Sequence, residues 1–419
     1  MKQVIILVAL SVASHTATAA DPWMSNPQTL AADEVSQIEP AVAYNSVHNE
    51  FLVVWYAYPA TGSPFDIVGV RVDSSGLPLR PSFVISDVSG IEYEPDVAYD
   101  PAADHYLVVW TSDNNGPDYD IVGRFIPWDG PSPAFPVFEI QAGTPDQASP
   151  SVALNPDAGE FLIAWHNDDV GTPAWISARR WAADGSGPVT PAFDVVSGPD
   201  IRAWPAAAWN GPISEYLVVY ERLNGGAGYD VWGTRLSGTG TVLGSEIGIA
   251  ESLDNEGSPD VASCRGDYIV AWTALPGPDT QIHTRAIAGD GTAGATIGHP
   301  SQGYDRSYLP YVACNSSGAE HLVSWHSLFP NGHYGVIGSF VELGGDAGEN
   351  FQIATDTVGT LDFANPVVTF GGQQQAMVAW SSDRPDGTSI DISGRLVGGG
   401  IFADGFESGG TSYWFPVVP

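Results

Sequence analysis

A short apolar stretch that ends in an aromatic residue recurs seven times along the chain. Its first copy is Glu50-Phe-Leu-Val-Val-Trp55, and a proline lies 13 to 15 residues before the final aromatic residue of each copy. These aromatic residues are 55, 55, 55, 52, 53 and 55 positions apart, and they are Trp55, Trp110, Trp165, Tyr220, Trp272, Trp325 and Trp380. A period that is kept this well indicates a chain built from repeated structural units.

Each unit contains four short segments that are typical of β-strands. In the first unit they are residues 40–44, 51–58, 66–72 and 83–86, which are rich in Val, Ile, Phe, Tyr and Trp. Turns with Asn, Asp, Gly and Pro separate them, and apolar residues nowhere keep helical spacing over a long window. The pattern predicts an all-β, seven-bladed β-propeller with four-stranded antiparallel blades. The units are residues 39–93, 94–148, 149–203, 204–257, 258–309, 310–364 and 365–400.

The seventh unit lacks a fourth strand, and its counterpart stands at the other end of the chain. After the strand near Asp391 the sequence runs into three glycines at 398–400. Residues 28–33, which are followed by Glu39-Pro40, resemble the fourth-strand segment 83–87, which is followed by Glu94-Pro95. We therefore expect residues 28–33 to form the outer strand of the blade that holds Trp380, which closes the ring without an open sheet edge.

The repeated motifs resemble those of secreted bacterial β-propeller proteins, most of which have no assigned function. The elements that carry the resemblance are Val42-Ala-Tyr-Asn45, Glu215-Tyr-Leu-Val-Val-Tyr220 and Asp66-Ile-Val-Gly69 with their copies, over residues 28–397. The resemblance implies the fold and export, and it carries no catalytic residues. Residues 401–408, with Trp414 after them, are similar to a short C-terminal segment of other exported bacterial proteins. The tail 401–419 is interpreted either as a sorting tag or as a flexible end.

The N-terminus has the three-part layout of a secretory signal peptide. Lys2 provides the positive start, an apolar run extends from Val4 to Ala13, and Ala17-Thr18-Ala19 supplies small residues at the cleavage positions. We expect residues 1–20 to be removed and residues 21–400 to form the propeller. No later run is long enough for a transmembrane helix. The predicted location is secreted, periplasmic or on the surface of a bacterial cell.

The charge balance excludes two classes of partner. The chain has 49 acidic and 14 basic residues, which gives a formal net charge of −35. A polyanion repels phosphate groups, so nucleic acid and anionic membranes are not expected as partners.

The two cysteines stand on neighbouring units. Cys314 occupies the place of Tyr44 in its own unit, and Cys264 lies one residue past that place in the unit before. Both fall near the end of a first strand, which predicts a disulfide unless the neighbouring strands diverge too far. Two thiols cannot complete a four-ligand zinc site, and no pair of histidines lies at metal-binding spacing beside them. We predict no metal and no cofactor; calcium is the one alternative, because Asp113-Asn-Asn-Gly116 partly matches a calcium loop.

Residues that depart from the repeat are candidates for a site, because one ligand cannot contact seven blades alike. The third and fourth units depart most. Trp175 replaces an aspartate, Trp204 precedes Pro205 where four other units have Glu or Ser, and Tyr220 replaces the repeated tryptophan. Aromatic rings beside charged groups suit a sugar. The predicted ligand-binding residues, on the face with the long loops, are Trp175, Trp204, His166, Asp168, Asp169, Glu221 and Arg222. The alternative is that the extra tryptophans only pack between blades.

Three functions are consistent with these observations. The main hypothesis is an exported propeller that binds a glycan or a protein through its long-loop face. The first alternative is a glycan-active enzyme, either a polysaccharide lyase or a glycoside hydrolase, which requires His or carboxylate side chains to converge at the centre of the ring. The second alternative is a structural envelope protein. His166, His326 and His333 lie near the long loops, but no G-x-S-x-G, H-E-x-x-H or P-loop motif is present, and the catalytic residues stay unknown.

Overall fold

The computed structural model describes most of the repeated region of the chain. The described residues are 24–32, 35–58, 65–88, 90–113, 116, 118–130, 135–223, 228–252, 254–275, 280–299, 306–315, 320–330, 332–342, 348–355, 365–383 and 389–398. The predicted signal peptide, the C-terminal tail and part of the Asp113–Gly116 segment lie outside them. No helix within these residues is long and apolar enough to cross a membrane.

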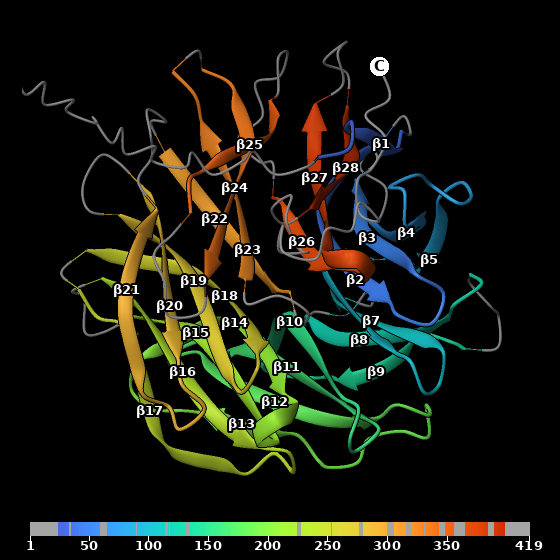
Figure 1. Ribbon diagram of the computed structural model, residues 1–419. Coiled ribbons are helices and arrows are strands. Elements are labelled where there is room, and N and C mark those ends of the chain that lie inside the picture. The colour runs from blue at the N-terminus through green and yellow to red at the C-terminus, as the bar shows by residue number, and fades with distance from the viewer. Residues whose placement is uncertain are drawn as a thin grey trace, which may run out of the picture.

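The strands form seven separate four-stranded antiparallel sheets, which confirms the predicted seven-bladed β-propeller. Figure 1 shows the sheets arranged around the centre of the molecule. Blade 1 consists of β2 (Ser36–Asn45), β3 (Glu50–Tyr58), β4 (Asp66–Asp73) and β5 (Phe83–Ser86). Blade 2 consists of β6 (Glu92–Asp100), β7 (His105–Ser112), β8 (Asp120–Pro127) and β9 (Phe138–Gln141). Blade 3 consists of β10 (Asp146–Asn155), β11 (Glu160–Asp168), β12 (Trp175–Ala182) and β13 (Phe193–Val196).

The remaining four blades follow in chain order. Blade 4 consists of β14 (Ile201–Asn210), β15 (Glu215–Leu223), β16 (Tyr229–Ser237) and β17 (Val242–Ala250), with a short 3-10 helix at Gly211–Ile213. Blade 5 consists of β18 (Asn255–Cys264), β19 (Asp267–Leu275), β20 (Gln281–Ile287) and β21 (Ala293–His299). Blade 6 consists of β22 (Arg306–Cys314), β23 (Glu320–Leu328), β24 (Tyr334–Glu342) and β25 (Phe351–Thr355). Blade 7 consists of β26 (Val367–Phe370), β27 (Gln375–Asp383), β28 (Ile390–Gly398) and β1 (Gln28–Ala31), with a second 3-10 helix at Gly372–Gln374.

The N-terminal strand closes the ring as predicted. The strand β1 pairs antiparallel with β28, with Gln28 opposite Gly394 and Thr29 opposite Ser393. The pairing extends past the strand, because the Ser25 amide donates to the Leu396 carbonyl oxygen at 3.0 Å and the Arg395 guanidinium donates to the Ser25 carbonyl. The last blade is therefore held by hydrogen bonds between the two ends of the described chain.

The hydrophobic core is divided among the interfaces between blades. Each of seven clusters combines residues of two neighbouring blades; one of them joins Leu30 and Met377 of blade 7 to Phe51 and Trp55 of blade 1. The repeated aromatic residues are all buried there, as their recurrence predicts. Burial of large rings at every interface explains why the motif is kept in each unit.

Arginines on the third strands tie neighbouring blades together. The Arg124 guanidinium of blade 2 donates to the Ile85 carbonyl oxygen on the outer strand of blade 1 at 2.6 Å. Equivalent bonds run from Arg179 to Ile140, from Arg285 to Ile249 and from Arg395 to Ile353. Each bond satisfies an outer-strand carbonyl with a charged donor, which is a stronger interaction than a neutral hydrogen bond.

Candidate functional site

The first strand of every blade contains the same irregularity, which sets the geometry of the centre of the ring. The residue before the repeated proline has a positive φ in each blade: 53° at Glu39 and Glu94, 52° at Ser149, 49° at Trp204, 51° at Ser258, 50° at Leu309 and 34° at Asn365. In six of the blades the ladder to the second strand skips there, for example between Ile38 and Ala41. We call these seven residues the bulge ring. The first strands of neighbouring blades contact one another all the way around, so the bulge ring surrounds the central axis.

Glu94 is held in place by donors from two blades. Its Oε2 accepts hydrogen bonds from the Thr111 hydroxyl at 3.2 Å, the Ser149 amide at 2.9 Å and the Ser149 hydroxyl at 3.1 Å. Burial raises the pKa of Glu94, and these three hydrogen bonds oppose the rise because they stabilise the carboxylate.

Glu39 occupies the same position in blade 1 but lacks this support. Burial, followed by the negative charge of Glu94, raises the pKa of Glu39 from 4.5 to about 7. No donor among the described residues forms a hydrogen bond with its carboxyl group. Two neighbouring carboxyl groups at equivalent positions therefore differ in environment: Glu39 is biased toward the protonated form, and Glu94 is fixed by donors.

Two aspartates lie two residues further along the first strands, next to the repeated proline. The Asp96 carboxylate accepts from the Val152 amide of blade 3, and the Asp260 carboxylate accepts from the Val312 amide of blade 6, both at 2.7 Å. Burial raises the pKa of Asp96 to about 6 and that of Asp260 to about 7, and the charge of Asp96 adds to the second shift. Burial and then these four carboxylates also raise the pKa of Tyr311.

The described residues make the centre of the ring acidic. Among the described residues, no arginine or histidine contributes to the pKa of Glu39, Glu94, Asp96 or Asp260. The centre therefore combines a carboxyl group that burial biases toward the protonated form with a second one that accepts three hydrogen bonds, in surroundings that repel anions.

Three of the sequence-predicted site residues lie at or beside the bulge ring. Trp204 is a member of the ring and is 49% exposed, and the His166 ring of blade 3 packs edge-on against it with centroids 6.3 Å apart. Burial lowers the pKa of His166 to about 4, which keeps its imidazole neutral. Glu221 caps the ring position of blade 5, because its Oε1 accepts from the Ser258 amide at 2.6 Å. Burial raises the pKa of Glu221 to about 7.

The other predicted residues lie elsewhere. The half-buried Trp175 indole donates to Ser177 Oγ and to Asp194 Oδ1, both at 3.1 Å, on the outer strands of blade 3. Arg222 donates to Asp200 Oδ2 at 2.7 Å and stacks over the Trp232 ring at 4.3 Å. Asp168 and Asp169 are exposed at the end of β11. The structure thus separates His166, Trp204 and Glu221 from the rest of the predicted set.

A charged network accounts for several departures of blade 4. Arg202 is buried where blades 1 and 3 have Gln37 and Gln147, and its guanidinium donates to both oxygens of Glu246 at 3.1 Å. The Tyr220 hydroxyl donates to Glu246 Oε1 at 2.8 Å. A tyrosine thus replaces the repeated tryptophan at a position where its hydroxyl reaches the carboxylate that pairs with Arg202.

The sequence interpretation missed Glu39, Glu94, Asp96 and Asp260 as site residues. The signal was present, since all four flank a repeated proline where the other units have uncharged residues. The pairs Glu39-Pro40 and Glu94-Pro95 occur in two units, so they resemble part of the repeat rather than departures from it. Comparison of each repeat column for charge would have found them.

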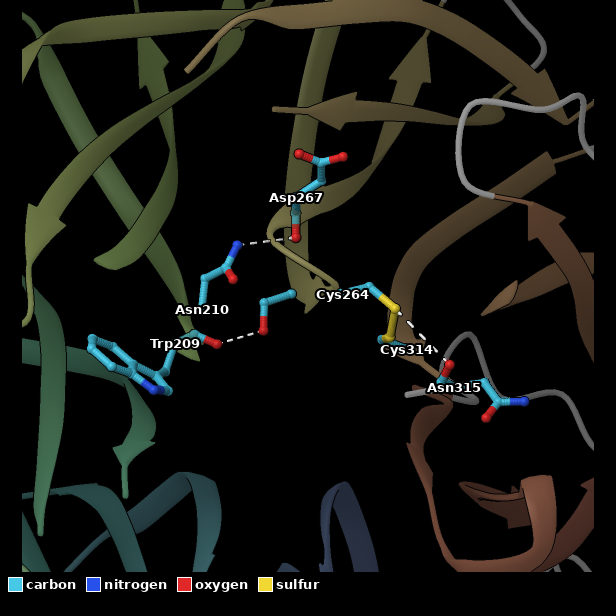
Figure 2. Close-up of a disulfide and its surroundings, with 7 residues drawn as sticks. Trp209, Asn210, Cys264, Asp267, Cys314 and Asn315 are labelled. Atoms are coloured by element: carbon cyan, nitrogen blue, oxygen red, sulfur yellow. Dashed lines mark hydrogen bonds between the residues drawn. A yellow bond between two sulfur atoms is a disulfide. The ribbon is translucent and has the colours of Figure 1, made fainter. Parts of the chain in front are cut away.

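The two cysteines form a disulfide at the C-terminal ends of two neighbouring first strands, away from the bulge ring. Cys264 ends β18 of blade 5 and Cys314 ends β22 of blade 6, and Figure 2 shows the bond between their sulfurs. Their Cα atoms are 5.7 Å apart. The first strands therefore stay close enough at this end for a covalent link.

Comparison with known proteins identifies the fold. No protein-family model and no curated protein matches the chain. A protein of unknown function from Dyadobacter fermentans is 12% identical, with a TM-score of 0.55, and the match covers 90% of this chain and 98% of that one. The family 93 α-L-arabinofuranosidase of Fusarium graminearum, solved with arabinobiose, is 12% identical over 90% and 98% of the two chains, with a TM-score of 0.51. The polysaccharide lyase Uly1 is 8% identical over 90% and 99%, with a TM-score of 0.53. At these identities the likeness shows a shared propeller architecture.

Proposed function

We propose that this protein is an exported hydrolase of neutral glycans, with Glu39 and Glu94 as its acid and base pair. The observation that carries the proposal is the contrast between these two carboxyl groups at equivalent positions of neighbouring blades. A glycosidase needs one carboxylic acid that stays protonated near neutral pH and a second one that is ionised. Burial and the charge of Glu94 favour protonated Glu39, whereas three hydrogen bonds stabilise ionised Glu94.

The two groups divide the reaction between them. Glu39 donates its proton to the oxygen of the glycosidic bond as that bond breaks. Glu94 either attacks the anomeric carbon or removes a proton from the attacking water, depending on the separation of the carboxyl groups in the substrate complex. Each acid or base role contributes about 10² to 10⁴ to the rate.

The charge of the centre supports neutral substrates. A lyase abstracts a proton next to the carboxylate of a uronic acid, and that step requires a cation or a hydrogen-bond donor to neutralise the carboxylate. The four acidic groups at the centre instead repel uronates and sialic acids. A hydrolase that acts on uncharged sugars therefore fits this centre better than a lyase does. The Fusarium enzyme, solved with the neutral sugar arabinobiose, offers a precedent for this chemistry on the same fold.

Trp204 supplies a surface for a sugar ring in this proposal. A large aromatic residue at a positive φ is strained, and such strain is concentrated at functional sites. The exposed indole is supported on one side by the neutral His166 ring. Stacking of a sugar on its exposed part places the substrate in the bulge ring together with the carboxyl pair.

The experiment is an activity screen of the mature chain on neutral arabino-, xylo- and gluco-oligosaccharides and on uronate polysaccharides. We expect release of reducing ends from a neutral substrate and no unsaturated product from the uronates. Glu39→Gln and Glu94→Gln should each lower kcat by about 10² or more. Glu139→Gln, at an exposed position of β9, is the matched control and should leave kcat unchanged.

Two outcomes would contradict the hydrolase. If neither Gln variant lowers kcat, Glu39 and Glu94 do not act as the acid and base of the reaction. Retention of a neutral glycan without turnover, lost in Trp204→Ala and kept in Glu39→Gln, would identify a binding protein, which the exposure of Trp204 favours as the second candidate.

A further inference from the structure

Blades 5 and 6 depart from the repeat at three positions that come together in space. The fifth residue after the repeated proline is Asn or Asp in five units and Cys264 in blade 5; the fourth is Cys314 in blade 6. Four residues before the repeated aromatic residue, five units have Phe or Tyr, whereas blade 6 has His321. The three departures do not touch the proposed acid–base pair, which lies at the other end of the first strands.

The replaced residues have structural roles that the new residues do not fulfil. In blade 1, Asn45 caps the turn after the first strand by accepting from the Val47 and His48 amides at 3.0 and 2.9 Å. A cysteine at this position gives up that cap. His321 replaces a buried ring and is itself 0% exposed; a weak backbone hydrogen bond at Val341 acts on one of its ring nitrogens, and the other has no partner among the described residues. A buried polar group without a partner is costly, and such a group calls for an explanation.

The position of His321 beside the two cysteines supplies an explanation for its burial. His321 lies directly opposite Cys314 in the ladder between β22 and β23. One ring nitrogen and the two sulfurs all lie within 4.8 Å of one another, and this is the one such group among the described His, Cys, Asp and Glu side chains. Figure 2 shows the two cysteines at the ends of adjacent strands, where the Asn315 carbonyl oxygen is 4.0 Å from Cys264 Sγ.

We propose that Cys264, Cys314 and His321 form a metal site that binds a thiophilic cation such as Zn²⁺ when the disulfide is reduced. Two thiolates and one imidazole are a ligand set that Zn²⁺ accepts, and they leave one position of a tetrahedron for water or another oxygen. The disulfide gates the site, because its neutral sulfurs are poor ligands, whereas the two thiolates formed after reduction and loss of their protons bind Zn²⁺ strongly.

Reduction of the disulfide opens the site. A dithiol reductant transfers two electrons and two protons to the disulfide; the Cys264–Cys314 bond breaks, two thiols form, and the reductant leaves as its own disulfide. Zn²⁺ then displaces the two thiol protons and accepts a lone pair from neutral His321. Half-buried Cys314 is the sulfur that the reductant reaches first, since Cys264 is buried.

The test uses the tag-free mature chain without oxygen, before and after reduction, with Zn²⁺ in competition with a chromogenic chelator and Co²⁺ as the spectroscopic probe. We expect the reduced chain to bind one equivalent, with the visible bands and thiolate charge-transfer absorption of tetrahedral Co²⁺. The oxidised chain should bind none. Proton release of two per metal ion provides a second readout.

The repeat itself supplies matched variants. His321→Phe installs the ring of blades 1 and 3, so the variant should fold and should re-form its disulfide on oxidation. Its Zn²⁺ affinity after reduction should be at least about tenfold weaker. Cys264→Asn installs the turn cap of blade 1 and should bind no Zn²⁺ at this site. The proposal is overturned if the reduced chain binds no metal, if His321→Phe binds as tightly as the parent, or if reduction alone abolishes the near-ultraviolet circular dichroism of the folded ring.

Discussion

Blades 1 and 2 and blade 4 all depart from the repeat with charged residues, but only blade 4 compensates for them. In blade 4 the buried Arg202 is paired with Glu246, and Arg222 is paired with Asp200. In blades 1 and 2, Glu39 and Glu94 lie next to each other with no cation among the described residues that affects their pKa. A departure whose charge is balanced locally supports its blade, whereas one without a nearby opposite charge costs stability and marks a candidate functional position.

The first way to break this comparison is to remove the compensation in blade 4. Glu246→Ala leaves Arg202, which is 2% exposed, as a buried charge without its partner. We expect the free energy of unfolding to fall by about 3 to 5 kcal/mol. Urea denaturation measures the change.

A double variant provides the control for that measurement. Arg202→Gln installs the residue of blades 1 and 3, and its combination with Glu246→Gln should recover most of the loss. Equal destabilisation of the single and double variants would mean that the charge pair is not what holds blade 4.

The second test asks whether the uncompensated carboxyl groups cost stability as pH rises. The pKa of Glu39 is about 7 in the folded protein and 4.5 ordinarily, so the folded state holds the proton more tightly. Its stabilising contribution is complete below pH 4.5 and is lost as the pH rises through 7. We expect Glu39→Gln to remove about 2 kcal/mol of the decline in unfolding free energy between these pH values.

Chemical denaturation at a series of pH values, for the parent and Glu39→Gln, measures this slope. Glu139→Gln serves as the exposed control and should not alter it. If the unfolding free energy depends on pH in the same way in the parent and in Glu39→Gln, ionisation of Glu39 does not cost stability. That result would contradict its assignment as the acid.

The third and smallest effect distinguishes the two tryptophans that the sequence grouped together. Trp175→Ala removes two hydrogen bonds within blade 3 and should cost about 2 kcal/mol of unfolding free energy. Trp204→Ser installs the residue that Ser149 and Ser258 provide at the same backbone geometry, and it should change stability by less than about 0.5 kcal/mol. Thermal and urea unfolding of both variants check the contrast, and a larger loss for Trp204→Ser than for Trp175→Ala would assign Trp204 to the scaffold.

The fold was predictable because it depends on residues that recur at regular intervals along the chain. Seven copies of one motif predict seven blades, and the missing fourth strand of the last unit predicts its partner at residues 28–33. The proximity of Cys264 and Cys314 follows from the same counting. Each of these predictions needs only the order of residues within a unit.

The candidate site was predictable only in part, since contacts between blades decide it. Trp204 and Trp175 look alike as departures, but one lies in the bulge ring and the other donates to Ser177 and Asp194. In the sequence, Glu39 and Glu94 look like two copies of one repeated residue. The structure distinguishes them, because Thr111 and Ser149 donate hydrogen bonds to Glu94. The positive φ that places these side chains around the axis has no sequence signature beyond the proline that follows.

The pairing of β1 with β28 also sets the order of events when the protein is made. The first strand of the described chain waits for its partner until residue 398 has been synthesised, so blade 7 is completed last. Until then the apolar surfaces of blades 1 and 6 that face it stay uncovered. The ring therefore cannot be finished blade by blade from a growing chain, and a chain cut short within blade 7 should be a target for proteolysis rather than a smaller propeller.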